Sequence, residues 1–179
     1  GATILSEIES LPHGLLFWRS STHFIGGLGG VVFLIMFLPA VGTVGFRMSK
    51  MEVMEVSRSN FRIRFKKIIR VFVTGYLAIT VLSFVALLLS GMSPFDAINH
   101  AFSVVSTGGF STRNLSIAAY DSPLIEFVLI LFMVVSSIHF GLIYASFATR
   151  SAKIFKDPAT KFYLMTILIS SVLVAISLM

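Results

Sequence analysis

Four long apolar segments constrain the fold of this chain more than any other feature of its sequence. They run from about Leu15 to Val41, from Ile68 to Ser90, from Leu124 to Ala148 and from Phe162 to Met179. A helix needs about 20 mostly apolar residues to cross a bilayer, and only the fourth segment stops slightly short of this. Of the 179 residues, 56% are hydrophobic and 12% are charged, whereas roughly 25% are charged in soluble domains. The sequence therefore predicts an all-α membrane protein.

A shorter helix is predicted between the second and third apolar segments. Ser93 is a good N-cap, Pro94 suits the first helical position, and Asp96 lies near the positive end of the helix dipole. The helix continues over residues 97–105, and about a dozen residues are too few to span a bilayer. We therefore expect a re-entrant helix that enters the membrane and ends halfway.

The basic residues indicate the orientation of these helices. Apart from Arg19 and Arg113, they lie in two connections between apolar segments. The first connection contains Arg47, Lys50, Arg58, Arg62, Arg64, Lys66, Lys67 and Arg70, and the second contains Arg150, Lys153, Lys156 and Lys161. Such residues stay on the cytoplasmic side, so residues 91–122 are expected outside. The net charge of +6 then reflects topology rather than nucleic-acid binding, with contacts to acidic lipid or a cytoplasmic partner as an addition.

A polar, glycine-rich loop, residues 106–112, follows the predicted re-entrant helix. Unpaired backbone groups are costly in hydrocarbon, so such a loop at membrane depth must lie inside protein or line a wet cavity. Glycines let the backbone turn its carbonyls to one side, and a row of carbonyls can replace the water around a cation. The alternative is that Thr107-Gly108-Gly109 forms an ordinary turn. A phosphate loop would need a preceding strand and a following lysine, and both are missing from the sequence.

The sequence also contains the signs of an internal repeat. The first six residues resemble the end of a second such loop, and Ser20-Ser21-Thr22-His23-Phe24 resembles Ser136-Ser137-Ile138-His139-Phe140. The chain begins at Gly1 without a methionine and ends inside an apolar run. We therefore expect an internal fragment with the end of one unit, one whole unit and the start of a third.

Several polar side chains lie within the predicted helices. His23 and His139 are expected to be neutral and hydrogen-bonded to neighbouring helices, and His100 is expected to anchor the packing of the re-entrant helix. Arg19 either reaches the headgroups or, as we expect, pairs with Glu7 or Glu9.

No cysteine is present, and no Ser/His/Asp set, metal-ligand cluster or carboxylate pair gathers in one place. The sequence therefore predicts no enzyme and no cofactor. Two alternatives to ion conduction remain: an intramembrane enzyme that uses Ser111 with His100 or His139, and a structural or sensory membrane subunit.

The chain closely resembles the TrkH/TrkG membrane subunits of the Trk potassium-uptake family, within the Trk/Ktr/HKT superfamily. The likeness lies in residues 11–20, 91–98, 100–103, 107–112 and 121–126, in the expected order. It is looser from His23 to Met36 and from Val44 to Lys66.

The resemblance implies four helix–pore loop–helix repeats around one pore, as in a potassium channel. The chain then divides into residues 1–46 (the end of the pore loop and the second helix of repeat one), 47–67 (a cytoplasmic basic loop), 68–149 (the complete repeat two), 150–161 (a cytoplasmic loop) and 162–179 (the start of repeat three). The carbonyls of Thr107, Gly108 and Gly109 would bind potassium in a filter that includes Phe110. Gly1 would match Gly109 in the preceding repeat.

The resemblance also implies a biological setting. Such subunits take up potassium, the transported ligand, across the bacterial cell inner membrane as multi-pass proteins. They work as homodimers with the nucleotide-binding regulatory subunit TrkA. Their gating loop belongs to the third repeat and would lie beyond Met179.

Overall fold

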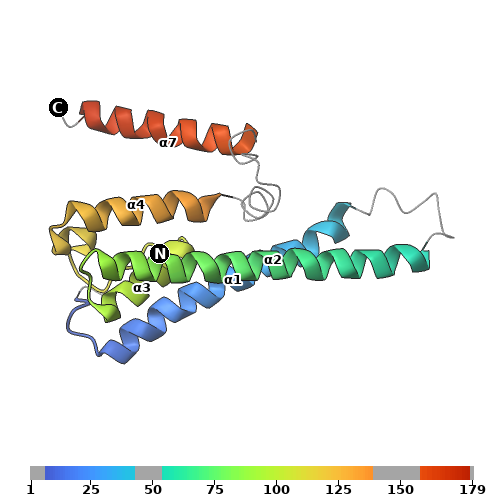
Figure 1. Ribbon diagram of the computed structural model, residues 1–179, viewed down its shortest axis with the longest axis horizontal. Helices are drawn as coiled ribbons and strands as arrows, with labels where there is room; N and C mark the ends of the chain where they lie inside the picture. The colour runs from blue at the N-terminus through green and yellow to red at the C-terminus, as the bar shows by residue number, and fades with distance from the viewer. Residues whose placement is uncertain (1–6, 43–53, 139–157, 178–179) are drawn as a thin grey trace. The chain divides into compact units, whose positions relative to one another are not determined.

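The computed structural model describes residues 7–42, 54–138 and 158–177. In chain order the elements are α1 (His13–Gly42), α2 (Met54–Leu89), α3 (Pro94–Val105), the short 3-10 helix η1 (Ser116–Tyr120), α4 (Pro123–Ser137) and α7 (Pro158–Ser177). Every regular element in these described ranges is helical, so the all-α prediction is confirmed. The elements from α1 to α4 belong to one compact unit, and α7 belongs to a second. Figure 1 shows each helix in chain order.

Two helices in the described ranges are long and apolar enough to cross a membrane, Ile69–Leu89 within α2 and Pro158–Ser177. Their positions agree with the second and fourth apolar segments. The apolar helix α4 is described over 15 residues, and the predicted end of this segment lies outside the described residues. The division into repeats stays a prediction.

The start of α2 differs from the prediction. Residues 47–67 were expected to form a loop, but α2 begins at Met54, so much of this basic stretch is helical. Arginine, lysine and methionine are good helix formers, and a helix continues past the apolar part that lipid requires. The apolar pattern therefore located the span Ile69–Leu89 but not the start of the helix.

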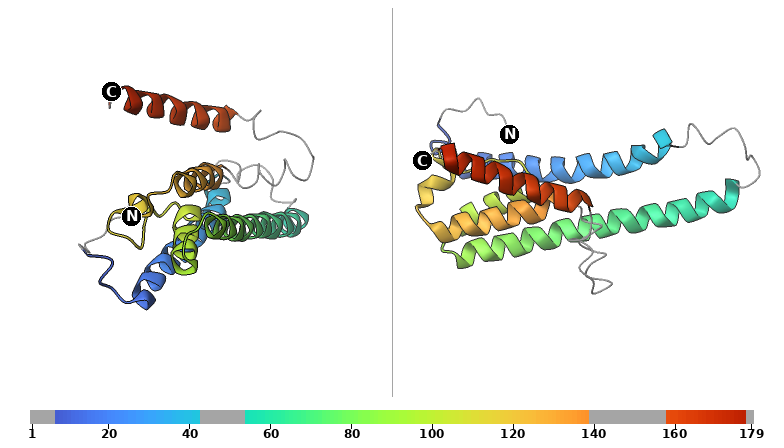
Figure 2. Two further views of the ribbon diagram at one scale, coloured as in Figure 1. Left: turned by 60° about the vertical axis from the view of Figure 1, so that its left-hand side comes forward. Right: turned by 90° about the horizontal axis from the view of Figure 1, so that it is seen from above.

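The short helix α3 packs against α1, α2 and α4, and Figure 2 shows it beside α1 and α2 at one end of this unit. Ala97 and Ala101 are fully buried in it, because their small side chains let the neighbouring helices approach closely. The apolar core of this region consists of Leu87, Met92, Ala97, Val104, Ile125 and Leu129. The core holds α3 firmly and thereby positions the loop that follows it.

Local sequence explains where α3 begins and ends. The hydroxyl of Ser93 accepts a hydrogen bond from the backbone N–H of Asp96 at 3.1 Å, and Pro94 occupies the first turn, as predicted. At the other end, Thr107 donates to Val104 O at 3.1 Å and Gly108 donates to Ser103 O at 2.8 Å. These two bonds are those of a Schellman motif. Helix α3 therefore stops after 12 residues, a length of about 18 Å.

Candidate functional site

The loop after α3 has an unusual backbone. Thr107 has a φ of 54° and Gly109 has a φ of 74°, whereas Gly108 between them lies outside the left-handed region. Thr107 occupies the position of a Schellman motif that glycine usually takes, and a β-branched residue is rarely left-handed. In the turn after α2, Gly91 takes this position with a φ of 91°. The loop thus holds strain at a residue that the sequence singled out, a feature common at functional sites.

Three N–H groups of this loop donate hydrogen bonds to α3. Those of Thr107 and Gly108 donate to the carbonyls at the end of the helix, and that of Phe110 donates to the hydroxyl of Ser103 at 2.7 Å. Within the described part of the chain, no donor reaches the carbonyl oxygens of Thr107, Gly108 or Gly109. Three of the four N–H groups from Thr107 to Phe110 are therefore bound to α3, and the carbonyls of this run are left available as acceptors.

Three side chains along one face of α3 bind three consecutive residues beyond the glycines. Ser103 binds the N–H of Phe110, His100 Nε2 lies 3.0 Å from Ser111 Oγ, and Asp96 Oδ1 accepts from Thr112 Oγ1 at 2.6 Å. The three residues on α3 are four and three positions apart in the sequence: Asp96, His100 and Ser103. Residues three and four apart share one face of a helix. One face of α3 therefore binds the run of residues 110–112, here called the strand after the loop. We call this set of contacts the α3 strap.

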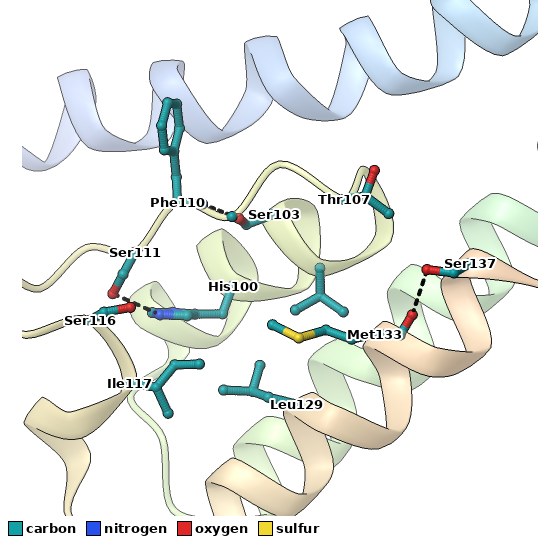
Figure 3. A pocket seen from close by; sticks show the side chains of 12 residues that line it. His100, Ser103, Thr107, Phe110, Ser111, Ser116, Ile117, Leu129, Met133 and Ser137 are labelled. Atoms are coloured by element: carbon teal, nitrogen blue, oxygen red, sulfur yellow. Dashed lines mark hydrogen bonds between the residues drawn. The ribbon is translucent and has the colours of Figure 1, made fainter. Parts of the chain in front are cut away.

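The tautomer of His100 follows from its partners. Nδ1 lies 2.8 Å from the carbonyl oxygen of Asp96, and a carbonyl only accepts, so Nδ1 carries the proton. In the neutral ring, Nε2 then accepts from the hydroxyl of Ser111, as Figure 3 shows. The ring joins α3 to the strand after the loop, in agreement with its expected role in packing.

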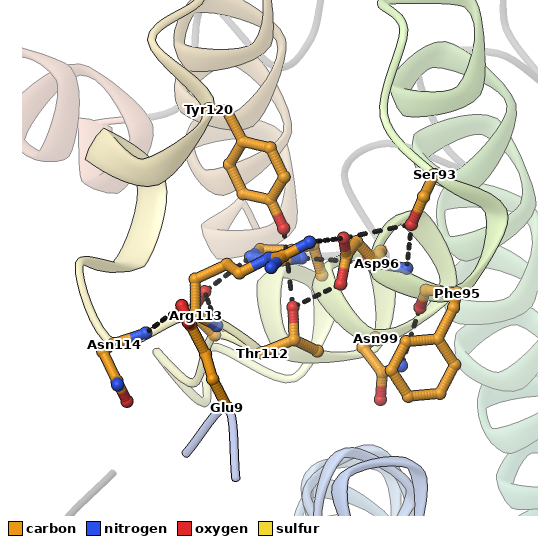
Figure 4. Close-up of polar contacts among 11 residues, drawn as sticks. Glu9, Ser93, Phe95, Asp96, Asn99, Thr112, Arg113, Asn114 and Tyr120 are labelled. Carbon is orange, nitrogen blue, oxygen red and sulfur yellow. Dashed lines mark hydrogen bonds and ion pairs between the residues drawn. The ribbon is translucent and has the colours of Figure 1, made fainter. Parts of the chain in front are cut away.

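The carboxylate of Asp96 is the centre of a polar cluster on the expected outer side (Figure 4). It accepts from Thr112, from Ser93 Oγ at 3.0 Å and from a guanidinium nitrogen of Arg113 at 3.3 Å. Burial acts to raise the pKa of Asp96, but the hydrogen bonds from Thr112 and Ser93 and the charge of Arg113 outweigh it. The pKa of this carboxyl is therefore held below its ordinary value. The hydrogen bond with Tyr120 and the charge of Asp96 raise the pKa of Arg113.

This cluster predicts a dependence of stability on pH. Because the pKa of Asp96 is lower in the folded protein, its ionised form stabilises the fold fully above the unfolded value of about 3.9. The stabilisation is lost as pH falls through the lower, folded value. We expect the melting temperature of the purified full-length protein to fall below about pH 4, in part because Asp96 becomes protonated. In the Asp96→Asn variant this contribution to the fall should be missing, and identical profiles of melting temperature against pH for the two proteins would contradict the assignment.

The segment before α1 is tied to the same region. The N–H of Ile8 donates to Asn114 Oδ1 at 2.7 Å, and the N–H of Asn114 donates to Glu9 Oε1 at 3.2 Å. The prediction that Arg19 pairs with Glu7 or Glu9 is wrong, since its guanidinium carbon lies 3.8 Å from the ring centroid of Phe110. Among the described residues, the ion pair that forms is Arg113–Asp96. Arginine is well suited to lie over an aromatic face, and tertiary packing put a ring within its reach.

A cavity of about 270 Å³ lies between the loop and α4. Figure 3 shows its lining from α3, the loop, η1 and α4. Thr107 and Gly109 border it on one side and Leu129 and Met133 on the other. The glycine loop therefore packs closely on α3 but leaves open space toward α4.

The structure brings four of the five predicted filter residues, Thr107 to Phe110, into this one loop. Gly1, like His139, lies outside the described residues. Sequence reasoning placed Asp96 at the helix terminus but missed that it binds Thr112, and it did not single out Ser103. A polar pattern at helical spacing on one face of a short, otherwise apolar helix was the available signal.

The amino-acid sequence matches the TrkH family of cation transport proteins over residues 1–178. The Trk system potassium uptake protein TrkH of Escherichia coli (strain K12) is 34% identical over 166 residues, which cover 92% of this chain and 34% of that protein. The Trk system potassium uptake protein TrkG of the same strain is 33% identical over 167 residues, with the same shares of 92% and 34%.

The fold has a solved counterpart as well. The crystal structure of the potassium transporter TrkH from Vibrio parahaemolyticus matches with a TM-score of 0.75 at 32% identity, covering 92% of this chain and 33% of that chain. The chain thus spans about a third of the length of these relatives. The likeness extends along nearly all of the chain in both sequence and fold. The chain belongs to the TrkH family of cation transport proteins.

Proposed function

We propose that the loop Thr107–Phe110 is one strand of a potassium-selective filter and that the chain acts in potassium uptake as part of a longer protein. The observation that carries this proposal is the division of the loop's backbone groups. The N–H groups of Thr107, Gly108 and Phe110 bind α3, and the carbonyls of Thr107, Gly108 and Gly109 accept no hydrogen bond from described residues. Such carbonyls are suited to replace the water around a dehydrated cation. The known relatives are named as potassium uptake proteins, in line with this choice of ion.

The electrostatics of α3 support a cation at this place. Its C-terminal end, which carries a partial negative charge, leads directly into Thr107, and its last turn contains no basic residue. The carbonyls and the helix terminus therefore act in the same direction. A Thr-Gly-Gly turn that binds no ligand would need neither the available carbonyls nor a helix terminus free of basic residues.

The wider setting is part of the same proposal. Potassium-binding carbonyls from one strand cannot surround an ion, so the filter requires further strands. Gly1 would belong to one of these further strands. We place the protein in the bacterial inner membrane as a multi-pass subunit, working as a homodimer with the regulatory subunit TrkA. Potassium is the transported ligand in this scheme, and no cofactor takes part.

The contact between Ser111 and His100 makes the enzyme alternative concrete. A hydroxyl that donates to a neutral imidazole is the arrangement of an activated nucleophile. The same contact also holds the strand in place, and Arg113 N donates to Ser111 Oγ at 3.1 Å. One variant separates the two roles.

We expect Ser111→Ala to reduce potassium uptake by less than about tenfold, because a lost hydrogen bond costs on the order of 1 kcal/mol and the filter uses backbone oxygens. Rubidium uptake into vesicles that contain the full-length protein measures this effect. Ser10→Ala, which removes an exposed hydroxyl bonded to Glu7 O, is the control. Complete loss of function in folded Ser111→Ala protein would favour the enzyme instead.

A further inference from the structure

Helix α1 contacts the filter loop on the side away from the cavity. A Cβ added to Gly27 would lie 2.9 Å from the Cβ of Ser106, and one added to Gly108 would collide with Nδ1 of His23. The ring of His23 lies 4.0 Å from that of Phe110, centroid to centroid.

The contacts of Gly27 and His23 with the loop continue the contact between Arg19 and Phe110 at a regular spacing. Every fourth residue of α1, namely Arg19, His23 and Gly27, meets every second residue of the loop, namely Phe110, Gly108 and Ser106. Along these three contacts, α1 and the loop run in opposite directions.

The side of the loop that faces away from α1 borders the cavity. Thr107 and Gly109 line it, whereas Ser106 and Gly108 do not. Within residues 106–109, the residues that contact α1 therefore alternate with those that border open space, and Phe110 at the end of the loop does both. Helix α1 supports the loop from one side and leaves the cavity side unobstructed.

The two central glycines consequently serve different purposes. Gly109 has a φ of 74° and nothing within 4 Å of an added Cβ, so its requirement is conformational. Gly108 lies outside the left-handed region, and the atoms that an added Cβ would meet are the Nδ1 and Cγ of His23 and the hydroxyl of Ser106. The requirement at Gly108 is therefore space, and His23 occupies that space.

The ring of His23 is restrained. It packs on Phe110, whose ring also lies against the guanidinium of Arg19. A flexible side-chain terminus would move aside for a methyl group at low cost. A ring in contact with a second ring moves less easily, and a shift of His23 would displace Phe110 at the end of the filter loop.

We propose that His23 is a positioning residue for the filter: it sets the distance between α1 and the loop and makes glycine necessary at position 108. The proposal rests on the proposed function, since it concerns the geometry of that same loop. It gives α1, which is separated from α3 along the chain by all of α2, a direct part in shaping the ion path. Arg19 and Gly27 complete the register on either side.

A double-variant experiment in the full-length protein tests this proposal. Gly108→Ala should lower the melting temperature and reduce the ratio of rubidium to sodium uptake. Adding His23→Ala should restore both, giving a non-additive coupling of about tenfold in uptake, within the range for residues in contact. The matched control is Gly109→Ala, which His23→Ala should not rescue because its strain lies in the backbone.

The outcomes separate the possibilities. Additive effects of Gly108→Ala and His23→Ala on both readouts would overturn the proposal, as would equal rescue of Gly109→Ala. If Gly108→Ala gives no folded protein, recovery of folded protein in the double variant supports the contact, and its absence contradicts it. The coupling in melting temperature is read without ion flux, so wild-type protein that transports no rubidium would refute the proposed function alone.

Discussion

Replacement of Gly109 by alanine is expected to reduce potassium uptake about tenfold and to weaken the preference for potassium over sodium. Gly109 has a φ of 74°, and holding an L-residue in this region costs roughly 1–2 kcal/mol. About 1.4 kcal/mol corresponds to a factor of ten in the population of the native loop. An added Cβ meets no atom within 4 Å, so the loss arises from backbone conformation alone. Rubidium and sodium uptake into vesicles containing the full-length variant measure the effect.

Gly91→Ala is the control for the effect of backbone strain at a positive φ outside the filter loop. Gly91 has a φ of 91°, also with nothing within 4 Å of an added Cβ, but it lies in the turn between α2 and α3. This variant should lose a similar amount of stability and retain the ion preference. If Gly109→Ala protein folds and keeps wild-type uptake and selectivity, the loop is not the filter and a structural or sensory subunit becomes the better explanation.

The second large effect is expected from Asp96→Asn. The change removes the charge and turns one acceptor oxygen into a donor, next to donors on Thr112, Ser93 and Arg113. The side chain of Asp96 is 6% exposed, and hydrogen bonds to a charged group contribute about 1.5–3 kcal/mol. We expect a loss of about 2–3 kcal/mol in the free energy of unfolding. Arg113 is 45% exposed, so its ion pair adds little to this value.

Uptake should fall together with stability in Asp96→Asn, because Thr112 is one of the points where the α3 strap holds the strand beyond the filter. Denaturant unfolding of the detergent-purified protein and rubidium uptake are the two measurements. Asp121→Asn is the matched control, since Asp121 is exposed and left-handed with a φ of 43°, a conformation that asparagine tolerates. Equal stability losses in the two variants would contradict a special role of Asp96.

Much of the site could be predicted from residues close together in the sequence. The cap at Ser93, the start at Pro94 and the end of α3 before the glycines all depend on a few neighbouring residues, and the structure has them as expected. Hydrophobic length likewise located the apolar spans of α2 and α7. It failed at the start of α2, since a basic stretch that leaves the membrane remains helical without any apolar pattern.

The partners of the polar side chains could not be predicted in this way. Arg19 was assigned to a nearby glutamate because opposite charges attract, yet it lies over Phe110, far along the chain. The hydrogen bond from Thr112 to Asp96 spans 16 positions and that from Asn114 to Glu9 spans 105. Such contacts depend on how the helices pack, which local propensity does not contain.

The amino-acid sequence by itself determined that this chain is helical, that it suits a membrane, and that a short capped helix leads into a glycine loop, because hydrophobic length, capping and backbone freedom are properties of adjacent residues. Only the tertiary structure decided which groups hold that loop: the α3 strap on one side and Arg19, His23 and Gly27 on the other. The physical reason is that these contacts join segments separated by whole helices, and their geometry exists only once those helices have packed.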